Sequence, residues 1–120
     1  MRLLVCGGRE YNDRQWVYAV LDRVHERRPI SVLIEGEAAG ADTLAREWAR
    51  SRGVPLDPYP YPAAAGRRGG RVRNHQMLRH GRPELVIAFP GHTGTAHMVE
   101  IARDAQIKVI LAGSRPASLH

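Results

Sequence analysis

Short apolar runs alternate with stretches of helical periodicity along this 120-residue chain, and the alternation limits the fold more than any other feature. The apolar runs occupy residues 3–6, 31–35, 84–89 and 107–111. They are continuous rather than alternating, which is typical of strands buried on both faces of a parallel sheet. Residues 54–60 contain three prolines and predict only a weak edge strand, because proline cannot donate to a sheet ladder.

Four helices are predicted between these strands. Asn12 or Asp13 can cap the first helix, which carries apolar residues at helical spacing and closes at residues 27–29. The second begins near Ala41 and ends at Gly53, a natural C-terminal cap. The third spans about residues 71–80, and the fourth follows residues 91–95. Residues 63–70 predict a flexible loop of small residues.

This order predicts an α/β fold with a single doubly wound, mostly parallel, five-stranded Rossmann-like sheet and helices on both faces. Right-handed crossovers favour the strand order 3-2-1-4-5. We expect one domain over residues 1–113 and a loose C-terminal tail over residues 114–120. The first and fourth strands are then neighbours where the order reverses, and ligands of such sheets bind there, at the carboxyl ends of the strands.

Composition narrows the class of protein. We expect a cytoplasmic protein without a membrane anchor, because no apolar run approaches the ~18–20 residues that span a bilayer, and the apolar start is too short for a signal peptide. Cys6 is the single cysteine, and its apolar surroundings predict a buried structural thiol rather than a nucleophile. The net charge is +6 and Lys108 is the only lysine. An excess of arginine suits phosphate ligands, although it is also the usage of a GC-rich genome.

Three glycine-containing turns follow the first, second and fourth strands. In the predicted strand order they converge on one rim of the sheet, and each leads into a helix whose N-terminus attracts anions. Glycine lets the backbone approach a phosphate, but it is also the usual residue of any strand-to-helix turn. We predict that the turn Pro90-Gly91-His92-Thr93-Gly94-Thr95 holds the phosphate of a nucleotide-like ligand. The pocket residues predicted from these turns are Gly7, Gly8, Arg9, Gly36, Gly40, Ala41, Asp42, Pro90, Gly91, Gly94 and Thr95.

Two common nucleotide signatures are absent from the sequence. There is no G-x-x-x-x-G-K-[ST], which excludes a P-loop phosphate hydrolase, and no G-x-G-x-x-G follows the first strand. The glycine turns, together with the Gly40-Ala41-Asp42 helix start and Arg73-Asn74 with Met77, instead resemble the SLOG superfamily. The match is to its small bacterial and phage branch of YspA-type, YpsA-related proteins, and it extends from residue 1 to about residue 111.

That resemblance implies a nucleotide or nucleotide-derived ligand. Relatives in the superfamily include the lonely-guy phosphoribohydrolases, molybdenum-cofactor carrier proteins and the DNA-processing protein that loads single-stranded DNA, and many form dimers. Arg73 occupies a position like the arginine of the lonely-guy enzymes. Those enzymes carry a glutamate just after their P-G-G-x-G-T turn, whereas here Ala96, His97 and Met98 follow Thr95 and the next carboxylate is Glu100.

A carboxylate near the anomeric carbon is needed for N-glycosidic cleavage. Glu100 lies more than one turn into its helix and should point away, so Asp42, Glu35 or Glu37 would have to supply the carboxylate. Asp42 is equally a helix N-cap candidate. Asn74 can read a base or ribose hydroxyl or cap a helix, and Thr95 can both cap its helix and donate to phosphate.

Other candidates stay open. Arg9 and Arg73 can clamp a phosphate or remain solvated charges. The basic stretch of residues 67–73 can be a flap over an anionic ligand, a solvated loop or a nucleic-acid contact. Trp16 and Trp48 are expected to pack in the core. The histidines show no metal-ligand spacing, so no metal and no obligatory cofactor is expected. The histidines concerned are His75, His80, His92 and His97.

Three functions follow from these observations. The first is binding of a nucleotide or nucleotide-derived small molecule. The second is a nucleotide-processing hydrolase, cleaving an N-glycosidic or ribose-phosphate bond, with Arg73 on the phosphate and Asp42 as catalytic residues. The third is single-stranded nucleic-acid binding. No membrane partner is expected, and a homodimer or higher homo-oligomer is possible for a domain with one weak strand.

Overall fold

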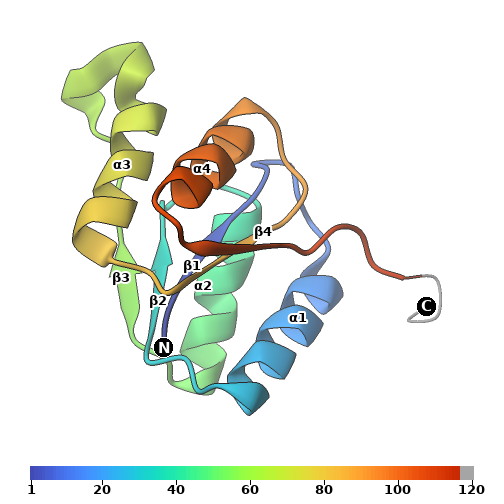
Figure 1. Ribbon diagram of the computed structural model, residues 1–120. Helices are drawn as coiled ribbons and strands as arrows, with labels where there is room; N and C mark the ends of the chain where they lie inside the picture. Colours follow the sequence, from blue (N-terminus) through green and yellow to red (C-terminus); the bar gives the residue numbers. More distant parts are fainter. Residues whose placement is uncertain (117–120) are drawn as a thin grey trace.

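A five-stranded parallel sheet forms the centre of the computed structural model, which describes residues 1–116 (Figure 1). The strand order is β3-β2-β1-β4-β5, which confirms the predicted doubly wound, Rossmann-like α/β fold. The strands are β1 (Arg2–Cys6), β2 (Val32–Glu35), β3 (Leu56–Pro58), β4 (Leu85–Ala88) and β5 (Lys108–Leu111). β1 pairs with both β2 and β4, so the strand order reverses beside β1.

Four α-helices cover the sheet, two on each face (Figure 1). They are α1 (Arg14–Arg27), α2 (Ala41–Arg52), α3 (Gly69–Gly81) and α4 (Thr93–Asp104), and a 3-10 helix, η1 (Ala63–Arg68), precedes α3. Alternate residues of β1 pack into the two cores on opposite faces of the sheet. Leu3 and Val5 belong to the core under α1 and α2, whereas Leu4 and Cys6 belong to the core under α3 and α4.

The first of these cores contains Trp48, which is fully buried and donates from Nε1 to Asp22 Oδ1 at 2.8 Å. Trp48 is therefore a core residue, as predicted. Trp16 packs against the edge of the same core and donates from Nε1 to the carbonyl of Gly113. Among the described residues, no helix is long and apolar enough to cross a membrane.

Some of the helix ends predicted from the sequence agree with the structure, and others differ. Asp13 caps α1 and accepts from Trp16 N at 3.1 Å, and Gly53 ends α2 in the left-handed conformation. The predicted loop over residues 63–70 is instead helical, because η1 leads directly into α3 at Gly69. In the tail, Arg115 pairs with Asp13, while residues 117–120 lie outside the described part of the chain.

Candidate functional site

The turns after β1, β2 and β4 meet at the carboxyl rim of the sheet, and the peptide groups of Gly8 join them. Gly8 N donates to the carbonyl of Pro90 at 2.9 Å. The carbonyl of Gly8 accepts from Ala41 N at 3.1 Å and from Tyr11 N at 3.2 Å. One residue of the β1 turn is therefore bonded to the start of α2 on one side and to the β4 turn on the other.

Two glycines are required by this close approach. Gly40 has φ +76°, and a Cβ there would lie 2.2 Å from Gly8 O. A Cβ on Gly91 would lie 2.2 Å from Thr95 Oγ1 and 2.8 Å from Gly8 N. Since real Cβ atoms do not approach backbone atoms so closely, no side chain fits at either position without displacing the neighbouring turn.

The start of α4 is open. Its N-cap residue is His92, which makes no capping hydrogen bond through its side chain, and the first bond of the helix runs from Ala96 N to His92 O at 3.0 Å. The N–H groups of Thr93, Gly94 and Thr95 precede that bond and have no acceptor within the helix. Thr95 is thus the third helical residue, and the prediction that it caps α4 is wrong.

A cavity of about 420 Å³ faces this helix start. It is lined by eight of the residues predicted from the sequence, namely Gly7, Gly8, Arg9, Asp42, Arg73, Asn74, Gly94 and Thr95. The other five are not in its lining: Gly36, Gly40 and Ala41 lie between β2 and the start of α2, and Pro90 and Gly91 border a separate hollow beside α4. The remaining lining residues are Cys6, Glu10, Ala38, Gly70, Met77, His92 and Thr93. His92 and Thr93 belong to the predicted phosphate turn, whereas the sequence did not place the other five in the pocket.

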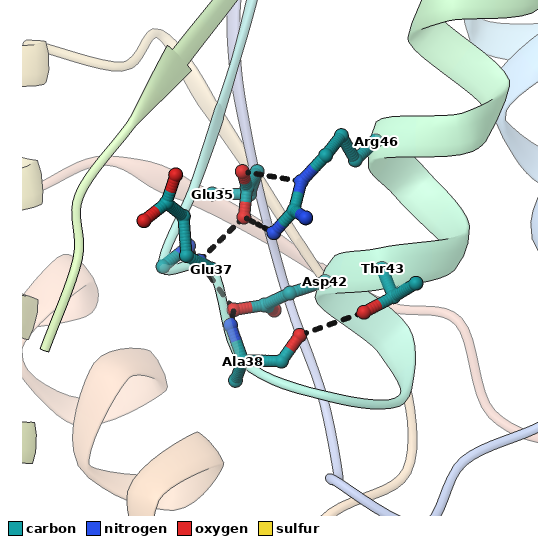
Figure 2. Close-up of polar contacts among 7 residues, drawn as sticks. Glu35, Glu37, Ala38, Asp42, Thr43 and Arg46 are labelled. Carbon is teal, nitrogen blue, oxygen red and sulfur yellow. Dashed lines mark hydrogen bonds and ion pairs between the residues drawn. The ribbon is translucent and has the colours of Figure 1, made fainter.

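Asp42 holds the β2 turn together from the first turn of α2. Its Oδ2 accepts from Gly36 N at 3.0 Å and from Ala38 N at 3.2 Å (Figure 2). The N-cap of α2 is Gly40, so the alternative of Asp42 as an N-cap is wrong. Burial raises the pKa of Asp42 to about 6, although the hydrogen bond from Ala38 acts in the opposite direction.

The other two candidate carboxylates do not line this cavity. Glu35 is fully buried and accepts from Arg46 Nε at 3.1 Å and Nη2 at 3.3 Å, as well as from Glu37 N (Figure 2). Glu37 borders an adjoining hollow of about 480 Å³, together with Arg9, Arg73 and Tyr61. Of the three carboxylates considered, Asp42 is the one in contact with the cavity.

Arg73, on α3, stands between the cavity and the adjoining hollow. Its guanidinium lies 5.7 Å from the centre of the Tyr61 ring, within cation–π range. Its Nε is buried without a hydrogen-bond partner in the described chain. A Cβ on Gly36 would lie 2.8 Å from this Nε, so the glycine leaves room for the arginine. A buried donor of this kind needs an acceptor that the described residues do not supply.

Asn74 contacts the start of α4 from inside α3 and does not cap a helix, whereas its contact with a base or ribose hydroxyl stays a prediction. Its Nδ2 donates to the carbonyl of Gly94 at 3.1 Å and lies 3.1 Å from His97 Nδ1. Burial lowers the pKa of His97, and Arg71 and His75 lower it further, which favours the neutral ring. An amide nitrogen only donates, so this contact requires the tautomer in which Nδ1 accepts. Asn74 thereby fixes the position of the Gly94 peptide.

A larger hollow of about 630 Å³ lies on the other side of the α4 start, between α4 and the end of β5. Glu100 borders this hollow and not the one with Arg73, as its position in the helix predicts.

Burial raises the pKa of the Cys6 thiol, so it is protonated at neutral pH and is not an activated nucleophile. In residues 1–116, no group of three His, Cys, Asp or Glu side chains is placed to hold a metal ion.

Comparison with known proteins gives two matches and one negative result. Residues 1–63 match the model of the YspA, cpYpsA-related SLOG family. The whole chain is similar to the Gene 61 protein of Mycobacterium phage D29, with 35% identity over 124 residues, covering 96% of this chain and 98% of the phage protein. No solved structure matches the chain.

Replacing Gly40 tests whether the contact between the first two turns limits stability. Gly40→Ala should lower the free energy of unfolding by about 2–4 kcal/mol, because the new methyl group clashes with Gly8 O in a disfavoured backbone conformation. Gly53→Ala is the matched control, since Gly53 has a similar φ of +69° but no atom within 4 Å of its Cβ, and it should cost only about 1 kcal/mol. Equal losses in urea unfolding would contradict the contact.

The raised pKa of Asp42 predicts a pH-dependent effect of Asp42→Asn. The folded protein binds the Asp42 proton more tightly than the unfolded chain, so the stability contributed by the protonated carboxyl is present below about pH 4 and lost as pH rises through about 6. Asparagine carries no charge at any pH. The variant should therefore equal the wild type near pH 4 and exceed it by up to ~3 kcal/mol above pH 7 in urea unfolding. A constant difference at all pH values would refute the assignment.

Proposed function

This chain belongs to the YspA, cpYpsA-related SLOG family, and on that premise we propose that it binds a nucleotide or nucleotide-derived ligand whose phosphate lies on the first turn of α4. The observation that carries the proposal is the open helix start. Three backbone N–H groups without helical acceptors border a 420 Å³ cavity, a volume within the range of small-molecule sites. The positive end of the helix dipole and these donors together favour an anion.

The surroundings of the helix start support the same ligand class. Arg9 and Arg73 line the cavity, and the buried Nε of Arg73 needs an acceptor. A Cβ on Gly94 would meet no atom within 4 Å, so space for a ligand lies directly against this peptide. A phosphate with three acceptor oxygens satisfies both the N–H groups and a guanidinium, whereas an apolar ligand satisfies neither.

Gly94 offers a variant that separates folding from binding. Gly94→Asp puts a carboxylate in the first turn of α4 without a clash, so the free protein should be as stable as the wild type or slightly more stable. The same carboxylate competes with phosphate for the N–H groups. With AMP, ADP or ADP-ribose at about 100 times Kd, the wild type should gain ~2.7 kcal/mol and melt several degrees higher, and Gly94→Asp should show no shift.

Gly94→Asn is the matched control in this thermal-shift series, because it adds a side chain of the same size without the charge. It should retain part of the shift if charge repulsion causes the loss in Gly94→Asp. A full shift in Gly94→Asp, or no shift of the wild type with any phosphorylated ligand, would rule out the phosphate position.

One observation favours a hydrolase as the second candidate function. Asp42, whose pKa of about 6 is suited to proton transfer near neutral pH, lines the same cavity as Arg73. Cleavage of the N-glycosidic bond of a nucleoside monophosphate should then release free base, detectable by chromatography, and the release should fall by at least a hundredfold in Asp42→Asn. Release of free base that persists unchanged in this variant would exclude Asp42 as the catalytic carboxylate.

A further inference from the structure

Only one oxygen of the Asp42 carboxyl group accepts hydrogen bonds from the described residues. Oδ2 accepts both turn N–H groups, from Gly36 and Ala38, and no hydrogen bond from residues 1–116 reaches Oδ1. In Figure 2 the dashed lines from Asp42 accordingly end on one of its two oxygens. The side chain is nearly inaccessible to bulk solvent, with 5% of the residue exposed, yet it lines the cavity. Oδ1 is not among the fully buried unpaired side-chain atoms of the described residues, so it is open to the cavity that Asp42 lines.

A carboxylate oxygen that faces a cavity and has no protein donor can accept a hydrogen bond from a ligand. The same cavity contains the opposite case, since Arg73 Nε is a buried donor without an acceptor. A ligand that satisfies both must carry an acceptor group and a hydrogen-bond donor. Inorganic phosphate, a dianion near neutral pH, serves Arg73 but offers Asp42 at most one acidic proton. A sugar phosphate supplies both groups, because its ring hydroxyls donate.

The phosphate position and Asp42 meet at Gly8. The Gly91 turn before α4 lies against the N–H of Gly8, and the start of α2 is bonded to the carbonyl of the same residue. The first turn of α4 and Asp42 therefore border one cavity. In a nucleotide the sugar is bonded directly to the phosphate and the base lies beyond it, so a ribose hydroxyl is the donor nearest to a phosphate held on α4.

Resting on the proposed function, we propose that Asp42 is a specificity-determining residue that accepts a hydrogen bond from a 2′- or 3′-hydroxyl, so that the site takes ribonucleotides in preference to deoxyribonucleotides. Glu10 also lines the cavity, but it is exposed and hydrated, so it gains little from a ligand hydroxyl. The cost of keeping the Asp42 carboxylate buried is offset when the ribose supplies its missing donor.

Calorimetric titration with AMP, 2′-deoxy-AMP and 3′-deoxy-AMP tests this inference on the wild-type protein. At least one deoxy analogue should bind about ten- to a hundredfold more weakly than AMP, because a hydrogen bond to a charged acceptor is lost. In Asp42→Asn the amide oxygen can still accept from the turn, and the ratio of AMP to deoxy-AMP affinity should fall to within about twofold. Glu10→Gln, which neutralises the other carboxylate, should keep the wild-type ratio.

The outcomes separate this inference from the function on which it rests. Equal binding of all three nucleotides by the wild type, with binding still lost in Gly94→Asp, would overturn the role of Asp42 and leave the phosphate site intact. A ribose preference that persists in Asp42→Asn would overturn it in the same way. Absence of binding to any of the three nucleotides and to inorganic phosphate would overturn both. The wild-type comparison requires no variant, so it decides the matter even if Asp42→Asn fails to fold.

Discussion

The peptide groups of Gly8 are the constraint on which the rest of the site depends. One hydrogen bond to Pro90 and one from Ala41 tie the ends of three parallel strands together at the position where the strand order reverses. Because both bonds need backbone atoms in near contact, the flanking turns must present glycine, as at Gly40 and Gly91. The cavity lies at this junction, and the β1 turn, the first turns of α2 and α4, and α3 line it.

Within the junction, some polar groups are paired inside the protein and others are not. Glu35 accepts hydrogen bonds from Arg46 and from the backbone of the β2 turn, and Asn74 donates to the carbonyl of Gly94 at the start of α4. Arg73 Nε is buried without a partner, Asp42 Oδ1 receives no hydrogen bond from residues 1–116, and both residues line the same cavity. Burial is the main cause that raises the pKa of Asp42 to about 6.

Apolar periodicity was sufficient to predict the sheet order and the helices, because strands buried on both faces and glycine turns leave strong local signals. The predicted strand order also implied that the three glycine turns converge. The hydrogen-bond partners of individual side chains could not be predicted from the sequence. Asn74 could not be matched with His97, nor Glu35 with Arg46, because these contacts join residues distant in sequence. Likewise, the cap of α4 was misplaced because His92, an unusual cap residue, takes that position through the path of the backbone.

The open start of α4 has a consequence for the energetics of the whole domain. The N-cap residue of α4 makes no side-chain capping hydrogen bond, as is also true of α2 and α3, and Asn74 holds the Gly94 carbonyl in place. Under the proposed function, the acceptor for the first N–H groups of α4 comes from a ligand. Binding of that ligand would raise the free energy of unfolding, so the stability of the domain would follow the ligand concentration.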